Sequence, residues 1–462
     1  MPDIVNPEHV VVVGASDDPS NIGQRFVRAL DRSAFPGRVS VVHPTSGPVL
    51  GYPVHRTLGE CPQPIGHVIV AVSGRPVLQV LQDAVAAGAR SVHLFAGGFA
   101  EASEEGAAFQ AELREVVRGT QTRVIGPNCM GIHRPSRGLT FRDDLPMRSG
   151  WLGVIAQSGG VAIATIRRAD ARQVGISTAI SYGNGVDINA SDALVLLADD
   201  PQTEVISLYL ESANDERIGP SLSYASERKP VVVWAVGASQ AGLAAGVHHT
   251  GAPGGPLDAD AVPNRCILVD RMDDLVDVAL VQRYIGADAV TGVAYASISG
   301  GFAVASAVEA EAHQLPMPVL GDKSLVELGD LYGPEAGNLT NPLDLGGAGY
   351  LSRGRLGPLM EVLDRDPSIG TAVFHLAWDY VEEAAGRVPG YRHRYLDALR
   401  QAIEAVELPV IVHCPDAGDP LTRVPACDAL REHGVLVIED ATTIWRGLGL
   451  CLRNGAVDGR SH

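Results

Sequence analysis

The feature of this sequence that most constrains its fold is the regular alternation of short apolar runs with amphipathic segments. Near the N-terminus the apolar runs are HVVVVG, RVSVVHP, HVIVAVS, SVHLFAGG and TRVIGPN, and the segments between them include SNIGQRFVRALDR and RPVLQVLQDAVAAG. Continuous apolar runs are typical of strands buried on both faces, and apolar residues at helical spacing predict crossover helices. Strands joined in this way form parallel sheets, so the pattern predicts a doubly wound α/β domain.

The same alternation returns twice after residues 133–150, a segment rich in Pro, Gly and Arg that we interpret as a linker. The stretches LGVIAQSGGVAIATIRRA and GVAYASISGGFAVASAVEA share an apolar strand, a Ser-Gly-Gly turn and an alanine-rich helix, and each is followed by an asparagine-containing loop. Gly159 and Gly300 stand 141 residues apart, about one domain length. This repetition predicts one fold used twice. We expect three domains, at residues 1–135, 150–288 and 291–462.

Length, charge and cysteine usage exclude several classes of protein. At 462 residues the chain is too long for one ordinary core, and its net charge of −18 argues against a nucleic-acid binder. The six cysteines form no CxxC pair, so we expect neither a disulfide framework nor a metal site. The N-terminus lacks a signal-peptide pattern, and no apolar stretch is long enough to span a bilayer. We therefore expect a soluble, cytoplasmic protein that binds neither nucleic acid nor membrane.

Two glycine-containing turns between a strand and a helix could bind anions. In VVVGASDDPSNIG, Gly14, Ser16 and Gly23 would turn backbone N–H groups and a helix N-terminus toward a ligand. The pattern is not GxGxxG, and His43 stands where an acidic residue would hold the ribose of NAD, so a different nucleotide-bearing ligand is favoured. In AQSGG the first N–H groups of a helix follow the glycines; the turn could bind phosphate or serve close helix–sheet packing.

A pair of histidines lies in the loop GVHHTGAPGG, in front of a glycine- and proline-rich run. No helical pattern continues through this stretch. The loop is either a solvent-exposed turn that contains histidine or a segment that carries an imidazole to a reacting group.

Ten motifs taken together resemble one family. In chain order they are VVVGASDDPSNIG, VVHPTSGPVLG, FAGGFAE, VIGPNCMGI, AQSGG, SYGNGVDIN, LYLES, HHTGA, SISGG and TNPLDL. The sequence resembles the α-type chain of the NDP-forming acyl-CoA synthetases, the superfamily of ADP-forming acetyl-CoA synthetase and succinyl-CoA synthetase. The resemblance implies a CoA-binding Rossmann-like domain followed by two flavodoxin-like domains of the succinyl-CoA synthetase type, with parallel sheets.

The resemblance also implies a reaction and two catalytic residues. Members of the family interconvert acyl-CoA, phosphate and NDP with carboxylic acid, CoA and NTP, through an acyl phosphate and a phosphohistidine. The phosphorylated histidine precedes Thr-Gly and corresponds to His249, with His248 as a neighbour. A neutral imidazole suits this role because it is a nucleophile near pH 7. Glu211 of LYLES corresponds to the glutamate that orients the histidine, although from the sequence alone it would be a strand-end residue that faces water.

The binding residues follow from the same correspondence. Gln157, Ser158, Gly159 and Gly160 match the helix N-terminus that receives the phosphoryl group. The positions that match CoA contacts are Gly14, Ser16, Asp17, His43, Pro44, Ser73, Gly97, Gly98, Phe99 and Asn128. Cys129 lies near the thiol end of CoA in the family, but a small buried thiol is the favoured interpretation. We expect the pocket for the acid near Asn128, the AQSGG turn and the loop around Asn184.

Some positions depart from the family pattern. The stretch WAVGASQAG carries no cation where the family often has Lys-x-Gly-Arg/Lys, and HPTSG lacks the asparagine and lysine of Asn-Pro-Lys. These losses predict weaker CoA affinity or phosphotransfer. No segment resembles an ATP-grasp loop, so NDP or NTP with Mg²⁺ is expected on a separate β-type subunit, in a homo- or hetero-oligomer. Two alternatives stay open: a nucleotide-independent acyl or carbamoyl transferase, and a non-catalytic CoA-binding regulatory protein.

Overall fold

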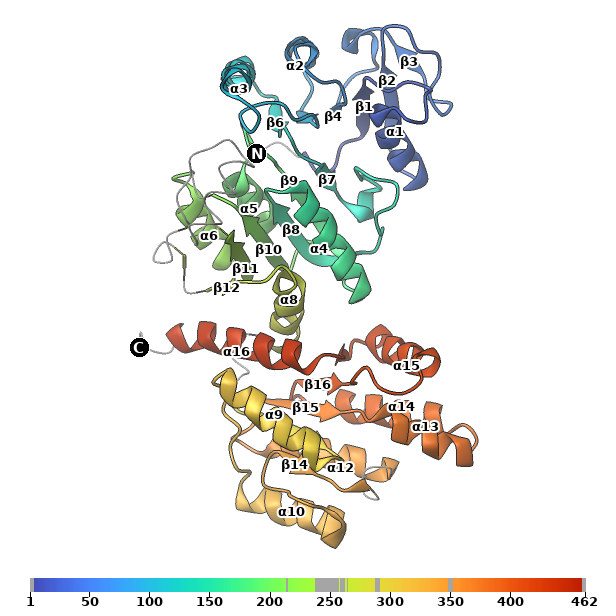
Figure 1. The fold of residues 1–462 in the computed structure, drawn as a ribbon, viewed down its shortest axis with the longest axis vertical. Helices are drawn as coiled ribbons and strands as arrows, with labels where there is room; N and C mark the ends of the chain where they lie inside the picture. Colours follow the sequence, from blue (N-terminus) through green and yellow to red (C-terminus); the bar gives the residue numbers. More distant parts are fainter. Residues whose placement is uncertain are drawn as a thin grey trace. The chain divides into compact units, whose positions relative to one another are not determined.

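The computed structural model of the chain describes residues 4–212, 215–236, 257, 262–263, 265–286, 291–347 and 352–458. In this part of the chain the strands form three sheets, two of six strands and one of five (Figure 1). All but one of the strand pairs described are parallel. The predicted α/β class with parallel sheets is confirmed.

The first sheet has the strand order β3-β2-β1-β4-β5-β6. Its elements are β1 (His9–Val13), α1 (Ile22–Arg32), β2 (Arg38–Val42), β3 (Val54–His55), the 3₁₀ helix η1 (Leu58–Glu60), β4 (His67–Val70), α2 (Pro76–Ala86), β5 (Ser91–Leu94), α3 (Glu104–Val117) and β6 (Arg123–Ile125). The chain winds outward from β1 on both sides, so the strand order reverses between β1 and β4. Such a switch point leaves a crevice at the carboxyl ends of the strands, where ligands bind in open α/β sheets.

Helices cover both faces of the first sheet. Leu81 of α2 and Leu113 of α3 join a buried cluster with strand residues that point to one face, among them Val92. His93 points to the other face because side chains alternate along a strand, and there Phe26 of α1 packs edge-on against it. The apolar runs of the sequence are therefore buried from both sides, as their continuity predicts.

The second sheet has the order β12-β11-β10-β8-β9-β7. Its elements are β7 (Gly131–His133), the 3₁₀ helix η2 (Pro135–Arg137), β8 (Ser149–Ala156), α4 (Gly159–Ala171), β9 (Ile176–Ser181), α5 (Ala190–Asp199), β10 (Val205–Leu210), α6 (Ile218–Ser226), β11 (Val231–Ala235), β12 (Cys266–Val269) and α8 (Asp274–Ile285). Strand β7 pairs antiparallel with β9 and is the exception to the parallel pattern.

The segment at 133–150 is more ordered than the linker interpretation predicts. Its first residue, His133, closes the buried strand β7. Arg134 is 7% exposed, and its guanidinium makes two hydrogen bonds of 3.1 Å to the carboxylate of Asp200. A buried charge needs such a partner, so these contacts fix the segment against the second sheet. The composition of the segment gave no sign of this ion pair.

The third sheet has the order β14-β13-β15-β16-β17. Its elements are β13 (Val293–Ser297), α9 (Gly300–Ala312), α10 (Asp322–Tyr332), the 3₁₀ helix η5 (Gly333–Glu335), β14 (Leu343–Asp344), the 3₁₀ helix η6 (Arg353–Arg355), α12 (Leu356–Arg365), β15 (Thr371–His375), α13 (Trp378–Arg387), α14 (Tyr391–Glu404), β16 (Val410–His413), α15 (Pro420–Glu432), β17 (Leu436–Ile438) and α16 (Ala441–Asp458). Both α4 and α9 begin at the first glycine of a Ser-Gly-Gly turn and are 13 residues long. The two turns that the sequence pairs thus occupy equivalent positions.

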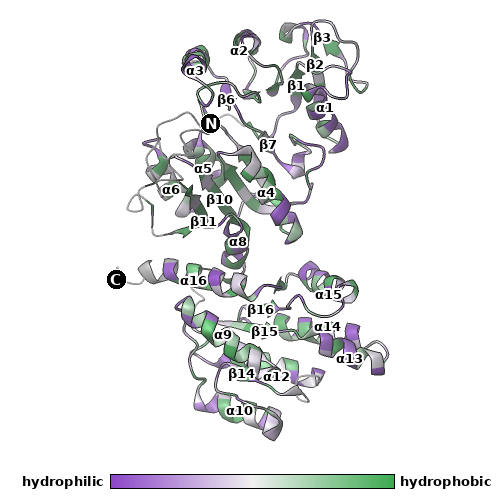
Figure 2. Cartoon of the chain, viewed as in Figure 1, coloured by the Kyte–Doolittle hydropathy of each residue, from purple (hydrophilic) through white to green (hydrophobic). Residues whose placement is uncertain are grey.

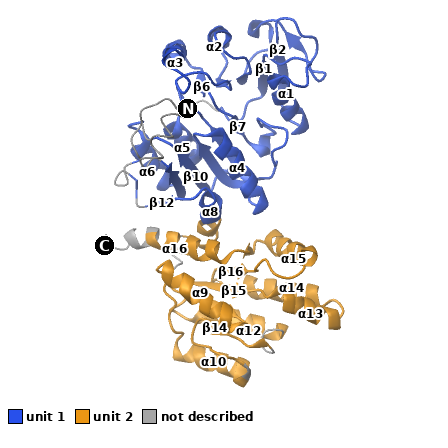
Figure 3. Cartoon of the chain, in the orientation of Figure 1, with its two compact units in different colours: residues 1–279 blue, residues 280–462 orange. Residues whose placement is uncertain are grey.

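The described chain divides into two compact units, residues 1–279 and 280–462 (Figure 3). The first unit contains the first two sheets, and the second contains the third. Figure 2 shows hydrophobic residues concentrated in the strands, while outer helices such as α13 are largely hydrophilic. None of the described helices combines the length and the hydropathy needed to cross a membrane. Within the same residues, no group of three or more His, Cys, Asp or Glu side chains could hold a metal ion.

Candidate functional site

The loops that follow the strands of the first sheet form a row along one edge of that sheet. The strands are parallel, so their carboxyl ends meet at this edge. The row runs through the loops after β2, β1, β4, β5 and β6. In that order, these loops hold His43 and Pro44, then Gly14, Ser16 and Asp17, then Ser73, then Gly97, Gly98 and Phe99, and finally Asn128. The CoA-binding positions expected from the sequence therefore lie on neighbouring loops.

Close packing explains Gly14, in the loop after β1, and Gly23, in the first turn of α1. Gly14 has φ +89°, which favours glycine, and a Cβ there would lie 2.6 Å from Val72 Cγ1. A Cβ on Gly23 would lie 2.6 Å from the Cα of Ala15. Asn21 caps α1, because its Oδ1 accepts the N–H of Gln24 at 2.9 Å. The N-terminus of α1 is thus held directly against the loop after β1.

The HPTSG turn has a cation that its own sequence does not reveal. His43 Nδ1 accepts the backbone N–H groups of Thr45 at 3.2 Å and Ser46 at 2.9 Å, the type of contact an asparagine side chain makes in such turns. Arg56, just after β3, donates one terminal nitrogen to the carbonyls of His43 at 3.0 Å and Ser46 at 3.1 Å. The side chain of Arg56 is exposed. It places a positive charge where the loop lacks a lysine.

The turn after β5 is organised by Glu101. One oxygen of its carboxylate accepts the N–H groups of Gly98 at 2.7 Å and Phe99 at 3.2 Å, and the other accepts Asn184 Nδ2 at 2.6 Å. Burial alone raises the pKa of Glu101, but the hydrogen bonds from Asn184 and the two backbone N–H groups outweigh it and hold the pKa below its usual value. The side chain of Phe99 is 1% exposed and stacks on Phe109, so a ligand at this turn meets its backbone.

Asn128 follows β6 and faces the same turn. Its φ of +58° is left-handed, a conformation that asparagine tolerates better than most residues. A Cβ on Gly97 would lie 3.2 Å from Asn128 Oδ1 and 3.0 Å from Glu101 Oε1. Glycine at this position therefore leaves room between the two side chains.

Three polar residues directly follow the last residues of adjacent strands in the second sheet. They are Gln157 after β8, Tyr182 after β9 and Glu211 after β10. Gln157 Oε1 accepts the backbone N–H of Glu211 at 3.0 Å and the hydroxyl of Tyr182 at 3.3 Å. Glu211 is 6% exposed, so the alternative in which it faces water is wrong. Burial and the neighbouring Glu211 carboxylate both raise the pKa of the Tyr209 hydroxyl.

The helix α4 starts beside these residues. Ser158 is its N-cap, and Ser158 Oγ accepts the N–H of Val161 at 3.5 Å. A Cβ on Gly159 would lie 2.8 Å from Met130 Cγ, so glycine allows the helix to begin against the loop after β6. The first turn of α4 contains no acidic residue. Its N-terminal dipole therefore remains available to an anion.

The two sets of loops meet around one cavity of about 300 Å³. Its walls are Phe95, Gly97, Asn128, Cys129, Met130, Gln157, Ser158, Gly159, Gly160, Gly183 and Asn184. None of these residues carries a charged side chain. The cavity brings Gly97 and Asn128 of the first domain to the N-terminus of α4. We call this space the junction cavity.

Cys129 is in the wall of the junction cavity, and the residue is almost completely buried. The residue is 4% exposed, and burial raises the pKa of its thiol well above the usual value. His93 Nε2 donates a hydrogen bond of 3.1 Å to the Cys129 carbonyl. Burial lowers the pKa of His93 to about 4, so the ring is neutral at pH 7. Both side chains support the loop that carries Asn128.

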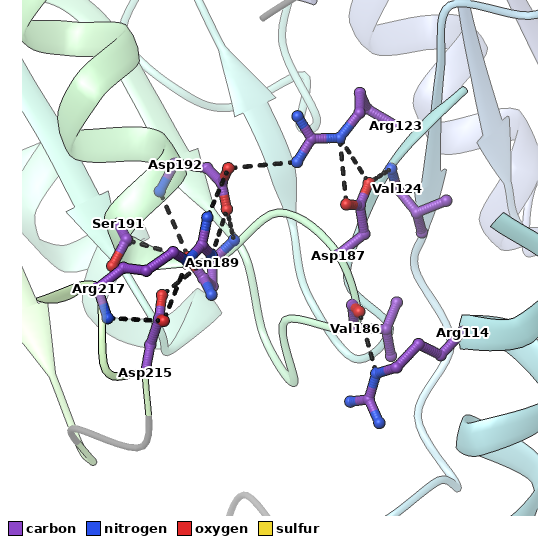
Figure 4. Close-up of polar contacts among 10 residues, drawn as sticks. All are labelled: Arg114, Arg123, Val124, Val186, Asp187, Asn189, Ser191, Asp192, Asp215 and Arg217. Carbon is purple, nitrogen blue, oxygen red and sulfur yellow. Dashed lines mark hydrogen bonds and ion pairs between the residues drawn. The ribbon is translucent and has the colours of Figure 1, made fainter. Parts of the chain in front are cut away.

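Ion pairs join the first two domains (Figure 4). Arg123 of β6 contacts Asp187 at 2.8 Å and Asp192 of α5 at 3.3 Å. Asp192 also contacts Arg217 at 3.1 Å, and Arg217 contacts Asp215 at 3.0 Å. Because Asp192 has partners on both sides, Asp215 and Arg217 are tied to the first domain. We call this network the interdomain clasp.

The structure places most, but not all, of the residues expected from the sequence. Gln157, Ser158, Gly159, Gly160, Gly97 and Asn128 line the junction cavity. His248 and His249 lie outside the described residues, so the role of His249 stays a prediction. Sequence reasoning missed Arg56 and Glu101. The final glutamate of FAGGFAE was the only available signal for Glu101, and Arg56 has none because its loop contacts arise from strand pairing.

Comparisons with known proteins agree with this architecture. Residues 8–135 match the CoA binding domain family, and residues 149–281 match the succinyl-CoA ligase like flavodoxin domain. The chain is 28% identical over 370 residues to acetate–CoA ligase [ADP-forming] I of Archaeoglobus fulgidus, an alignment that covers 79% of this chain and 53% of that one. It is also 28% identical over 346 residues to acetate–CoA ligase [ADP-forming] II subunit alpha of Pyrococcus furiosus, covering 74% and 75% of the two chains.

The whole fold has a counterpart among solved structures. The dinucleotide forming acetyl-coenzyme A synthetase 1 of Ca. Korarchaeum cryptofilum, solved with phosphate and ADP, superposes with a TM-score of 0.85. The match has 22% sequence identity and covers 99% of this chain and 98% of that chain, and at this identity it supports the fold alone. The chain spans about half the length of several curated relatives that it matches.

The fold, the row of loops and the matched domains together define a CoA-binding protein of the succinyl-CoA ligase kind. The chain belongs to the NDP-forming acyl-CoA synthetase family, and within that family it is an α-type chain. The resemblance drawn from the ten sequence motifs is thus confirmed.

Proposed function

We propose that this chain is the catalytic α-type subunit of an NDP-forming acid–CoA ligase. The observation that carries the proposal is the junction cavity, in which Asn128 and Gly97 of the CoA-binding domain face the N-terminus of α4 across a space without charged side chains. A separate β-type ATP-grasp subunit would hold NDP or NTP with Mg²⁺. The name of the Pyrococcus furiosus relative, a subunit alpha, supports a partner of this kind.

The proposed reaction has three steps. An oxygen of inorganic phosphate attacks the thioester carbonyl, the C–S bond breaks, and the thiolate takes up a proton to leave as CoA. The N–H groups of the first turn of α4 stabilise the oxyanion and the phosphoryl charge. A ring nitrogen of His249 then attacks phosphorus, the bond from phosphorus to the acyl oxygen breaks, and the carboxylate leaves. The phosphohistidine finally transfers its phosphoryl group to NDP on the partner.

Phosphohistidine labelling tests the proposal. The full chain, purified with any subunit that accompanies it, is incubated with acyl-CoA and radioactive phosphate. We expect acid-labile, base-stable label on the protein. His249→Asn should abolish the label, and His248→Asn should leave most of it. Label that survives His249→Asn and disappears in His248→Asn would move the active residue by one position, and no label in the wild type would reject the proposal.

Glu211 has a separate test. Its backbone is fixed by Gln157 and its side chain is buried, so Glu211→Gln keeps the shape and removes the charge. We expect labelling to slow without a change in the melting temperature, because the carboxylate steadies the charge on the histidine ring. Unchanged labelling kinetics would remove Glu211 from the mechanism.

The coenzyme site can be tested through Arg56. If this guanidinium replaces the absent lysine of HPTSG, Arg56→Ala should weaken CoA binding about tenfold and reduce its dependence on salt. Arg118→Ala is the matched control, because Arg118 is also exposed but caps the C-terminus of α3 and pairs with Glu115 of that helix. Equal CoA affinities in both variants would show that the turn binds CoA without this cation.

A further inference from the structure

A second cavity adjoins the junction cavity. It has a volume of about 400 Å³, and Gln157 and Asn184 line both spaces. The second cavity extends from these two residues past Tyr182 and Ser212 to Arg114 and Arg217. We call it the side cavity. Since water occupies about 30 Å³ in the liquid, the side cavity has room for an acyl group several carbons longer than acetyl.

The amide of Asn184 is fixed in one orientation. Its Nδ2 donates to Glu101 Oε2 at 2.6 Å and to Gln110 Oε1 at 2.8 Å, which uses both of its N–H groups. Both acceptors belong to the first domain, and the Glu101 carboxylate can only accept when ionised. The carbonyl oxygen Oδ1 of Asn184 is therefore the atom that remains for a ligand.

In Gln157 the amide oxygen, and not the amide nitrogen, is the atom that has hydrogen-bond partners. Its Oε1 accepts two hydrogen bonds, from the Glu211 N–H and the Tyr182 hydroxyl. The nitrogen Nε2 is therefore the atom that remains for a ligand, and it has no acceptor among the residues that the structure describes. Gln157 and Asn184 both line the junction cavity and the side cavity.

We propose that Gln157 Nε2 and Asn184 Oδ1 recognise a hydroxyl group on the acyl chain, so that the preferred substrate is a hydroxy acid. A hydroxyl oxygen can accept from one nitrogen while its proton is donated to a carbonyl oxygen, which matches this pair. An unsubstituted acyl chain offers neither contact and would leave both amide atoms without partners. The inference rests on the proposed function, because it takes the thioester to lie in the junction cavity and the rest of the acid to extend into the side cavity.

Binding of a matched series of thioesters tests this inference. The full chain is titrated calorimetrically with CoA, butyryl-CoA and the 2-, 3- and 4-hydroxybutyryl-CoA esters, without phosphate or nucleotide. We expect at least one hydroxy ester to bind about tenfold or more tightly than butyryl-CoA. Because no phosphoryl transfer is involved, a chain that fails the labelling experiment can still pass this one. No preference for any hydroxy ester overturns the inference.

Two variants locate the recognition. Asn184→Ala removes the acceptor, and we expect it to bind the preferred hydroxy ester and butyryl-CoA equally well. Tyr182→Phe is the matched control on the same wall, because Gln157 Oε1 still accepts the Glu211 N–H, and it should keep the preference. Loss of the preference in Tyr182→Phe with its retention in Asn184→Ala would overturn the assignment. So would an equal loss of affinity for CoA and both esters in Asn184→Ala, because the pair would then recognise the coenzyme. If Asn184→Ala does not fold, the ligand series on the wild type still decides.

Discussion

The Ser-Gly-Gly turns before α4 and α9 have the same sequence and start helices of the same length, yet their surroundings differ. At α4, Ser158 caps the helix with its own hydroxyl, and Gly159 faces the side chain of Met130. At α9, Ser299 makes no side-chain cap. There, a carboxylate oxygen of Asp344 lies 3.0 Å from the position that a Cβ on Gly300 would occupy.

This difference determines what each helix N-terminus can do. The positive end of a helix dipole attracts an anion from a ligand or from the protein itself. At α9 the chain supplies a carboxylate of its own, whereas the junction cavity at α4 is lined without one. The same turn therefore lies against a carboxylate of the chain in one domain and lines a cavity without charged side chains in another. The residues brought next to the turn by the sheet decide between the two.

The sharpest way to break this comparison is to give the α4 turn a carboxylate. Ser158→Asp keeps a good N-cap residue but places a negative charge where phosphate would bind. We expect phosphohistidine labelling to fall about 100-fold, with an unchanged or slightly raised melting temperature. Ser158→Asn is the control, because it caps the helix without a charge. Equal labelling of the two variants would contradict an anion site at α4.

A smaller effect is expected from crowding the same turn. A Cβ on Gly159 would lie 2.8 Å from Met130 Cγ, so Gly159→Ala must displace the loop after β6 or the start of α4. We expect labelling to fall about tenfold, because misplacement of reacting groups by less than an ångström is costly. Labelling kinetics and a melting curve separate this effect from unfolding. A variant that labels at the wild-type rate would show that the turn tolerates the shift.

Neutralising Asp344 tests the other turn. Asp344 Oδ1 accepts the N–H of Gly346 at 3.2 Å, and asparagine preserves this acceptor. Asp344→Asn therefore isolates the charge, and we expect the free energy of unfolding of residues 280–462 to fall by about 0.5–1 kcal/mol. Urea unfolding measures the change, which should shrink as salt is added. Unchanged stability at low salt would show that the carboxylate does not act on the dipole of α9.

The smallest effect concerns Glu101, whose carboxylate accepts two N–H groups of the turn after β5. Its pKa is held below the usual value, so its contribution to stability is complete above about pH 5 and is lost as the pH falls through the lowered folded pKa. In the wild type, melting temperatures measured between pH 3 and 7 should fall toward the acid end of this range. Glu101→Gln should make the melting temperature less dependent on pH in this range and should lower it at pH 7. An identical pH profile would show that Glu101 is not ionised in its contact with Asn184.

The sequence predicts the parts of this structure that depend on local patterns. The strands β1, β2, β4, β5 and β6 coincide with the apolar runs, and both Ser-Gly-Gly helices begin at the expected glycine, because burial and helix capping act on neighbouring residues. The decisive contacts of the site join residues far apart in the chain, such as Glu101 with Asn184 and Gly300 with Asp344. Only the packing of loops from different strands creates them, so no local pattern could reveal them.

The antiparallel strand β7 has a consequence for anyone who divides this protein. It follows the first sheet directly in the chain but pairs with β9 of the second sheet, in register from Gly131 with Ser181 to His133 with Ala179. A fragment that ends at residue 135 would carry β7 away from its partner. In the remaining fragment, β9 would become an edge strand without a partner on one side. An unprotected edge strand promotes aggregation. Expression of the separate halves should therefore cut the chain before Gly131, so that β7 stays with the second half.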